Sequence, residues 1–158
     1  MKVREYRRKD APGIRAMLDS LIDYADSILP ADLRKFEELN DRRGAVDYCI
    51  RLNYRKNWKT FVLESDDGTL TGFITGGIER EMRGYKLSKY GNIEIFFVEE
   101  NSRGKGAGKL LEEAMRGWFA GEGCDAVKVD TWTTNASARE AYRKMGFKEI
   151  AVTLVKEA

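Results

Sequence analysis

The run from Ile93 to Phe119 joins two hydrophobic patterns through a stretch that holds three glycines in five positions. Its first part, IEIFFV, is apolar apart from one glutamate, which is typical of a buried central strand. Its last part repeats apolar residues along one helical stripe, namely Leu110, Leu111, Ala114, Met115, Trp118 and Phe119. Because glycine weakens strands and helices alike, this pattern predicts a strand, a tight turn and a helix start where a ligand approaches the backbone closely.

The glycine turn predicts an anion-binding site. The first amides of a helix lack intrahelical acceptors, the helix dipole favours negative charge beside them, and glycine leaves room for a phosphate. Arg103, Lys105 and Lys109 add positive charge to the same stretch. A plain flexible loop is the alternative interpretation.

Two nucleotide-binding motifs do not fit this turn. A Walker A loop requires glycine where Arg103 stands and serine or threonine where Leu110 stands. The dinucleotide pattern G-x-G-x-x-G fails because Lys109 or Leu111 occupies its third glycine position, depending on the starting glycine. The turn therefore predicts a phosphate ligand of another kind.

Two motifs of the chain resemble one family. The hexapeptide RGKGAG, Arg103 to Gly108, resembles the R/Q-x-x-G-x-G/A signature of the GCN5-related N-acetyltransferases, the GNAT superfamily. The segment NASAREAYRKMGF, Asn135 to Phe147, is similar to the family's downstream N-x-x-A-x-x-x-Y-x-K-x-G-F pattern. IEIFFV stands where the family's fourth strand lies. The resemblance covers essentially the whole chain and is strongest from Ile93 to Phe147.

The expected fold is α/β (α+β): a GNAT-like mixed, mostly antiparallel sheet flanked by helices, in the order βααβββαβαβ. A single domain over residues 1–158 is expected. Alternation and β-rich composition predict strands at 2–8, 58–64, 70–78, 93–98, 126–132 and 147–155. Helical spacing predicts two helices before the second strand, with a possible break at Gly44. It predicts two more helices, one after the glycines with its apolar stripe at 110–119 and one at 136–145.

The resemblance implies acetyl-CoA as cosubstrate, with its pyrophosphate on the amides of the glycine turn and its pantetheine arm along the preceding strand. The positions that match are Phe96, Phe97, Val98, Arg103, Gly104, Lys105, Gly106, Ala107, Gly108, Lys109, Asn135 and Tyr142. Lys105 and Lys109 are equally well explained as solvated loop lysines.

Acetyl transfer to an amine requires a neutral amine, a polarised thioester carbonyl and help for the departing sulfur. Glu94 is the candidate base, because an acid within an apolar strand is costly unless it faces a cleft, and because it matches a family position. By resemblance, the Val98 amide polarises the carbonyl and Tyr142 acts as general acid. A solvent-facing glutamate and a core tyrosine are the alternatives.

The acceptor is expected to be a small-molecule or peptide amine, which the sequence does not identify. Asp23, Asp26 and Asp32 are candidates for attracting a cationic amine, although a solvated helix end explains them too. A non-catalytic acyl-CoA-binding module of the same fold and a nucleotide-binding protein are the competing hypotheses. Retention of both Glu94 and Tyr142 argues against the first of these.

Composition limits the partners. Lys and Arg number 28 against 26 Asp and Glu, and a net charge of +2 predicts neither nucleic-acid nor membrane binding. The absence of histidine excludes a Ser-His-Asp triad and His-ligated zinc, and no metal is expected. Cys49 and Cys124 form no C-x-x-C pair and are expected to be reduced thiols of a soluble cytoplasmic protein.

The end of the chain predicts an exposed sheet edge. After Gly146 there is room for only one strand or a short pair, in the segment FKEIAVTLVKEA. A homodimer that covers this edge is therefore expected.

Overall fold

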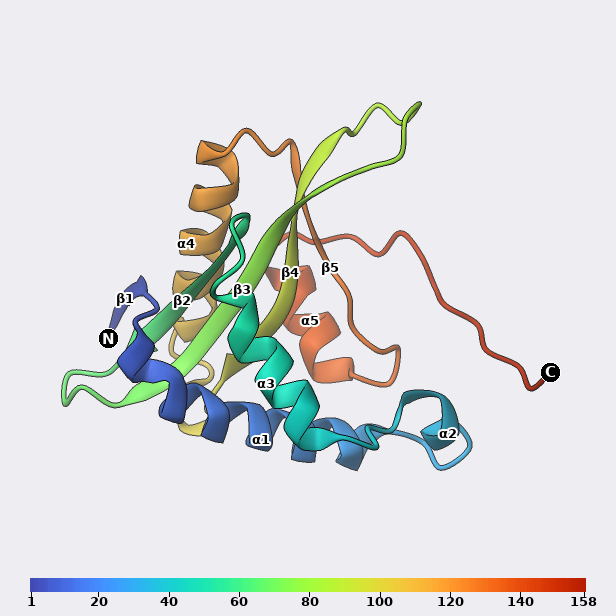
Figure 1. Ribbon diagram of the computed structural model, residues 1–158, viewed down its shortest axis with the longest axis horizontal. Helices are drawn as coiled ribbons and strands as arrows, with labels where there is room; N and C mark the ends of the chain where they lie inside the picture. Colours follow the sequence, from blue (N-terminus) through green and yellow to red (C-terminus); the bar gives the residue numbers. More distant parts are fainter.

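The computed structural model describes residues 1–158, which form a five-stranded sheet with helices on both faces (Figure 1). The strands lie in chain order: β1 (Lys2–Glu5), β2 (Trp58–Glu64), β3 (Leu70–Arg80), β4 (Lys89–Val98) and β5 (Ala126–Val129). Neighbouring strands from β1 to β4 are antiparallel, whereas β5 runs parallel to β4. The predicted mixed, mostly antiparallel sheet is therefore confirmed.

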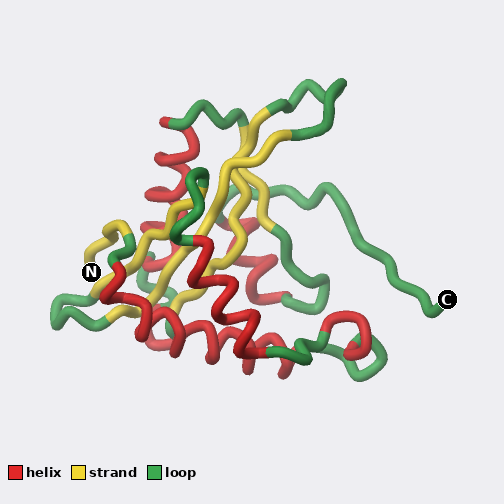
Figure 2. Tube along the Cα trace, viewed as in Figure 1, coloured by secondary structure: helices red, strands yellow, loops and turns green.

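The helices divide the core into two layers, one on each face of the sheet (Figure 2). They are α1 (Ala11–Ile28), α2 (Arg34–Glu37), α3 (Arg42–Leu52), α4 (Ala107–Gly121) and α5 (Ala136–Lys144). On one face, α1 and α3 pack Ile14, Leu18 and Ile50 against the inward side chains of the central strands. On the other face, α4 packs its predicted apolar stripe.

The helix α4 lies unusually close to the sheet. A Cβ atom at Gly91 would stand 2.2 Å from the ring of Phe119, so only glycine fits below this ring. Leu111, Met115 and Phe119 are each at most 1% exposed. This close contact fixes the last turns of α4 relative to the start of β4.

The strand β4 is paired with β5 along only its first part, and its pairing with β3 contains a bulge. A bulge interrupts its pairing with β3, because Thr75 lies opposite Ile95 and Gly76 opposite Ile93, which leaves Glu94 without a partner residue. The ladder between β4 and β5 covers only Tyr90 to Ile93, where it ends opposite Val129. From Glu94 to Val98 one side of β4 therefore has no strand beside it.

Three sequence predictions were wrong in detail. The break in the second helical stretch falls at residues 38–41, and Gly44 lies inside α3, where its amide donates to the capping side chain of Asp41 at 2.9 Å. The strands predicted at 2–8 and 126–132 are shorter, ending at Glu5 and Val129.

The predicted last strand, 147–155, does not form. The chain after α5 has no helix or strand and runs away from the body of the molecule (Figure 1). Ile150, Val152 and Leu154 are 83%, 68% and 89% exposed. The alternation that favours a strand is present, but a strand also requires a neighbour for its hydrogen bonds, and no strand of this chain pairs with the segment.

A candidate acetyl-CoA site between β4, α4 and α5

The glycine turn ends directly at the start of α4. Gly104 and Gly106 have φ angles of +73° and +82°, a left-handed conformation that side-chain-bearing residues adopt at a cost. Space around both glycines is open, since a Cβ atom added at either would meet nothing within 4 Å. Gly106 is the N-cap residue of α4 and provides no side chain to cap it. The sequence thus leaves this helix start uncapped.

The backbone amides of this turn have no acceptors within the chain. No amide from Gly104 to Lys109 donates to a backbone or side-chain acceptor, whereas that of Leu110 already bonds the Gly106 carbonyl at 3.1 Å. A run of unpaired amides at a helix N-terminus favours an anion with several acceptor oxygens. The turn therefore has the geometry of a phosphate cradle.

The charged side chains of the turn behave differently from one another. Arg103 folds back on β4: its Nε donates to the Val98 carbonyl at 2.9 Å, and its guanidinium lies 6.0 Å from the centre of the Phe97 ring. The backbone amide of Arg103 donates to the Glu100 carbonyl. Lys105 is exposed, and Lys109 lies 3.7 Å from Glu113. Arg103 thus ties the turn to the strand, while the two lysines reach solvent.

The open side of β4 carries the three residues expected beside the pantetheine arm. Phe97 points into the core below α1 and is 6% exposed. Phe96 and Val98 point to the opposite face, where they pack against the α4 core. Because no strand pairs with this side of β4, its edge is available to an extended ligand that carries amide groups.

The helix α5 brings Asn135 and Tyr142 to the same region. Asn135 caps α5, because its Oδ1 accepts from the Ala138 amide at 3.1 Å, and the Tyr24 hydroxyl donates to the same oxygen at 3.2 Å. The Tyr142 ring packs against Phe96, with 6.2 Å between centroids. Burial raises the pKa of Tyr142 to about 12, so its hydroxyl stays protonated at neutral pH.

Glu94 lies at the point where β4 and β5 separate. Its Oε2 atom lies 3.4 Å from Asn92 Nδ2, whereas Tyr142 packs against Phe96, two residues further along β4. Although the Glu94 side chain reaches solvent, partial burial raises the pKa of its carboxyl above the ordinary value, and the neighbouring charges of Glu79 and Asp130 act in the same direction. A raised pKa makes this carboxylate a stronger base.

A sequence model of the acetyltransferase (GNAT) family matches residues 15–147 of the chain. The chain belongs to this family. The resemblance read from RGKGAG and the downstream tyrosine motif is thereby confirmed. The α4 turn and the open edge of β4 both lie within the matched residues.

Two curated relatives of this GNAT chain match only part of their own length. Aminoglycoside N(6')-acetyltransferase type 1 from Stenotrophomonas maltophilia is 28% identical over 90 residues, which cover 56% of this chain and 59% of that protein. The uncharacterized N-acetyltransferase YobR of Bacillus subtilis is 28% identical over 93 residues, which cover 59% of this chain and 34% of that protein. The chain thus spans little more than half the length of the first relative and about a third of the length of the second.

Solved structures share the fold over the whole chain. A variant of the BH1408 protein from Bacillus halodurans superposes with a TM-score of 0.86 at 16% identity and covers 100% of this chain and 99% of its own. Aminoglycoside N-acetyltransferase AAC(6')-Iy, solved in complex with CoA, superposes with a TM-score of 0.72 at 18% identity. The alignment covers 99% of this chain and 98% of that chain. At these identities the likeness concerns the fold.

The GNAT sequence motifs did not reveal a polar network beside Glu94. Asn92 Nδ2 lies 3.3 Å from Glu79 Oε1 and 3.4 Å from Glu94 Oε2, and the Tyr90 hydroxyl donates to Glu79 Oε2 at 2.9 Å. Lys128 on β5 pairs with Glu81 and lies 4.0 Å from the centre of the Tyr90 ring. The available signal was the alternation of Tyr90, Asn92 and Glu94 in β4, but their partners on β3 and β5 are known only from the fold.

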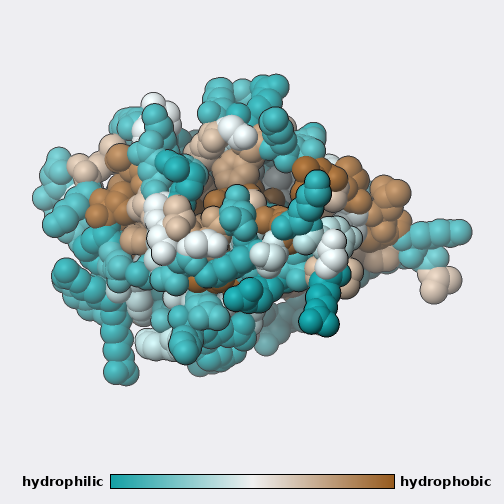
Figure 3. All heavy atoms as spheres, turned by 90° about the horizontal axis from the view of Figure 1, so that it is seen from above, coloured by the Kyte–Doolittle hydropathy of each residue, from teal (hydrophilic) through white to brown (hydrophobic).

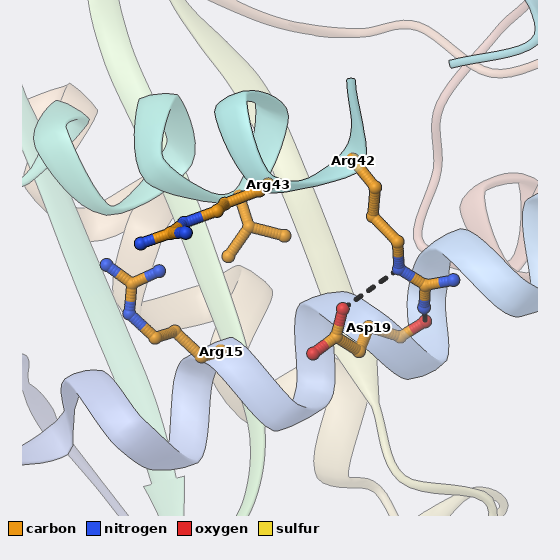
Figure 4. A pocket seen from close by; sticks show the side chains of 5 residues that line it. Arg15, Asp19, Arg42 and Arg43 are labelled. Atoms are coloured by element: carbon orange, nitrogen blue, oxygen red, sulfur yellow. Dashed lines mark hydrogen bonds and ion pairs between the residues drawn. The ribbon is translucent and has the colours of Figure 1, made fainter. Parts of the chain in front are cut away.

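The acidic candidates on α1 are not brought to this network as a group. Asp23 pairs with Arg42 at 2.8 Å. A cavity of about 350 Å³ between α1 and α3 is lined by Arg15, Asp19, Arg42, Arg43 and Val46 (Figure 4). Its arginines include two that already hold carboxylates, since Arg15 pairs with Asp47 at 2.6 Å and Arg42 also pairs with Asp19 at 3.0 Å. This cavity lies apart from the α4 turn.

The structure contains no group of three or more His, Cys, Asp or Glu side chains that is placed to hold a metal ion. None of its helices combines the length and the apolar character needed to cross a bilayer.

Proposed function

We propose that this protein is an N-acetyltransferase that moves the acetyl group of acetyl-CoA directly to a primary amine bound beside it. One observation carries this proposal: unpaired amides at the start of α4 stand next to the open side of β4, and that opening begins at Glu94. Phosphate binding, an edge for an extended arm and a basic carboxylate are thus arranged along one path.

The residues fit coenzyme A. The amides from Gly104 to Lys109 offer donors to its pyrophosphate without side chains in the way, and Lys105 and Lys109 add charge near these donors. The open edge of β4 at Phe96 to Val98 offers backbone groups to the amides of the pantetheine arm. Asn135 contributes from the start of α5. When bound, acetyl-CoA supplies an activated acetyl thioester.

Glu94 prepares the amine. Most amines are protonated at neutral pH, and only the neutral form is a nucleophile. The Glu94 carboxylate accepts a proton from the ammonium group through water, and its raised pKa makes this transfer more favourable than with an ordinary glutamate. The amine nitrogen then bonds to the acetyl carbon, whose oxygen accepts a hydrogen bond from the Val98 amide. The nitrogen passes its second proton to water as the carbon–sulfur bond breaks, which leaves a neutral amide.

Tyr142 assists the leaving sulfur. As the carbon–sulfur bond breaks, the thiolate takes the hydroxyl proton of Tyr142, which is then replaced from solvent. Because the pKa of Tyr142 is about 12, the proton is present when the reaction begins. Glu94 follows the last β4 residue paired with β5, and Tyr142 packs on Phe96 two residues later, so the proposed base and acid both lie along the unpaired part of β4.

The acceptor that suits this site best is a small amine with more than one positive charge. Glu79 and Glu94 stand near each other without a lysine or arginine bonded to either, whereas Glu81 is already paired with Lys128. The aminoglycoside N(6')-acetyltransferase among the relatives supports a small-molecule acceptor. Aminoglycosides and polyamines therefore form the first acceptor panel.

The test is an acceptor screen with acetyl-CoA, in which release of free thiol is followed by a chromogenic reagent. We expect acceptor-dependent thiol release with at least one multiply charged amine, and its loss in the Glu94→Gln variant. CoA binding by calorimetry without turnover on any amine would instead indicate a non-catalytic CoA-binding module. Binding of ATP or NAD without binding of CoA would overturn the whole assignment.

A further inference from the structure

The carboxylate of Glu94 has a single hydrogen-bond partner within the chain. Its Oε2 atom lies 3.4 Å from Asn92 Nδ2, and neither a lysine nor an arginine pairs with it. Glu94 stands in the bulge of β4, where it has no partner residue in β3, and its side chain is exposed. A long, exposed side chain with so few contacts would otherwise sample many orientations. Its orientation therefore depends on Asn92.

Asn92 lies on a firmly paired part of the sheet. In the register of β4 it stands opposite Gly77 of β3 and Lys128 of β5, so a strand pairs with it on each side. Its side-chain nitrogen carries two hydrogens, and it lies 3.3 Å from Glu79 Oε1 as well as 3.4 Å from Glu94 Oε2. Each hydrogen thus has a carboxylate as its acceptor, which fixes the plane of the amide.

Tyr90 anchors the other end of this network. Its hydroxyl donates to Glu79 Oε2 at 2.9 Å, so the Glu79 carboxylate has a donor on each of its oxygens. Glu79 and Tyr90 are also direct partners in the ladder between β3 and β4. Both lie toward the end of the sheet that carries the β3–β4 loop, where hydrophilic side chains surround smaller apolar areas (Figure 3). The network therefore runs from the paired part of the sheet to the bulge.

The side-chain amide between the two glutamates also affects the charge of Glu94. Burial raises the pKa of Glu94, the charges of Glu79 and Asp130 raise it further, and the charge of Arg55 opposes them. The thiol of Cys49 on α3, whose pKa is raised to about 11 chiefly by burial, stays neutral and adds no charge. A hydrogen bond donated to a carboxylate favours its charged form. The amide thus helps to keep Glu94 ionised, as removal of a proton from an amine requires.

We propose that Asn92 is a positioning residue for acetyl transfer: its side-chain amide holds the Glu94 carboxylate in the orientation in which it takes the proton of the acceptor amine. This inference rests on the proposed function, in which Glu94 is the base. Asn92 acts through Glu94 and needs no contact of its own with the acceptor. A change at Asn92 should therefore matter only while the Glu94 carboxylate is present.

A double-mutant cycle tests whether Asn92 acts through Glu94. Asn92→Ala should lower kcat/KM for the acceptor by about tenfold at neutral pH, the effect of one hydrogen bond to a charged group. In the Glu94→Gln background the same substitution should cost less than about twofold, because the carboxylate is gone. Asn40→Ala, at an exposed residue between α2 and α3, is the control and should leave kcat/KM unchanged. Equal losses in both backgrounds would show a merely structural role for Asn92 and contradict the proposal.

The titration of Glu94 in the free protein gives a readout that needs no turnover. Carbon NMR follows this carboxyl group in the wild type and in two variants. Asn92→Ala should raise the pKa of Glu94 because the donor is lost. Asn92→Asp keeps the shape of the side chain but adds a negative charge, so it should raise this pKa more. The acid limb of the kcat/KM profile should move to higher pH in the same order. An unchanged titration in both variants would rule out the positioning contact.

The positioning role and the base assignment can fail separately. Wild-type kcat/KM in Glu94→Gln would remove Glu94 as the base and, with it, the role of Asn92. A slow Glu94→Gln enzyme together with an unimpaired Asn92→Ala enzyme would refute the role of Asn92 alone and leave the base in place.

Discussion

The two sides of the proposed reaction are built in different ways. On the coenzyme side, recognition rests on the backbone: unpaired amides from Gly104 to Lys109 and the open edge of β4. On the acceptor side it rests on side chains that three strands bring together, with Glu79 from β3, Asn92 and Glu94 from β4, and Lys128 from β5. A backbone cradle depends on local conformation, whereas a side-chain network depends on strand register.

The two sides should differ in how much amino-acid substitution they tolerate. A surface change on β3 or β5 can alter the acceptor side without disturbing the coenzyme side, because the α4 turn contacts neither Glu79 nor Lys128. The coenzyme side tolerates less, since Gly104 and Gly106 both adopt left-handed conformations. Perturbations aimed at one side should therefore leave the other side's binding constant unchanged.

The largest effect is expected at Glu94, which belongs to the acceptor side. Glu94→Gln should lower kcat/KM at neutral pH by about 100- to 1,000-fold, because the amine loses its proton acceptor. Since the pKa of Glu94 is raised, wild-type activity should fall on acidification at a pH above the ordinary glutamate range, as the carboxylate becomes protonated. The variant should lack this limb and recover partly at high pH, where the amine is neutral.

A pH series of kcat/KM measures this effect, with Glu38→Gln, at an exposed residue paired with Arg34, as the control. Parallel profiles for wild type and Glu94→Gln would show that Glu94 is not the base. A changed CoA dissociation constant would break the separation between the two sides.

The next effect is expected at Tyr142, on the coenzyme side. Tyr142→Phe removes one oxygen and keeps the ring that packs on Phe96 and Phe147. We expect kcat to fall by about 30-fold while CoA affinity changes less than about twofold, since proton donation is lost but packing is kept. Turnover assays and calorimetry measure the two quantities, with Tyr85→Phe at an exposed position as control. Unchanged kcat would remove Tyr142 from the mechanism.

A matched pair of glycine substitutions tests the backbone cradle. Gly106→Ala forces a side chain into a conformation with φ of +82°, at a cost of about 1–2 kcal/mol, and should weaken CoA binding about tenfold. Gly117→Ala lies in the middle of α4 with open space around it, and should leave CoA binding unchanged while raising the free energy of unfolding by about 0.5–1 kcal/mol. Equal CoA affinities in both variants would argue against the cradle.

The smallest effect is expected at Tyr24, which touches the coenzyme side through α5. Tyr24 on α1 donates to Asn135 Oδ1 at 3.2 Å and so connects α1 to the start of α5. Tyr24→Phe should weaken CoA binding and raise the acceptor KM by about threefold each, the value of one modest hydrogen bond. An effect on only one of the two constants would show that Tyr24 serves that side alone. Titration of both substrates at saturating levels of the other separates the constants.

Much of the coenzyme side could be predicted from the sequence. The spacing of Gly104, Gly106 and Gly108 between an apolar strand and an amphipathic helix predicts the turn, because left-handed backbone and helix starts follow local rules. Glu94 was singled out as an acid in an apolar strand, but the bulge that leaves it unpaired was not expected. Register shifts depend on the partner strand, and the sequence of β4 does not specify how β3 pairs with it across the loop of residues 81–88.

The remaining errors share a cause. The alternation in residues 147–155 predicts a strand, and the side chains do alternate, yet the segment has no neighbour in the chain. Asp23 stays a candidate for attracting the acceptor, but its ion pair with Arg42, 19 residues away along the chain, was not expected. In both cases the local pattern was interpreted correctly, but the presence or absence of a partner far away in the sequence could not be inferred from it.

The sequence by itself determined most of the elements, the glycine turn and the family, because helix starts, turns and hydrophobic periods are set by residues close together in the chain. Only the tertiary structure decided that β4 opens at Glu94, that Glu79 and Asn92 lie beside it, and that the C-terminal segment stands alone. These features depend on which strands become neighbours and in what register, and pairing between distant segments is settled by the packing of the whole chain.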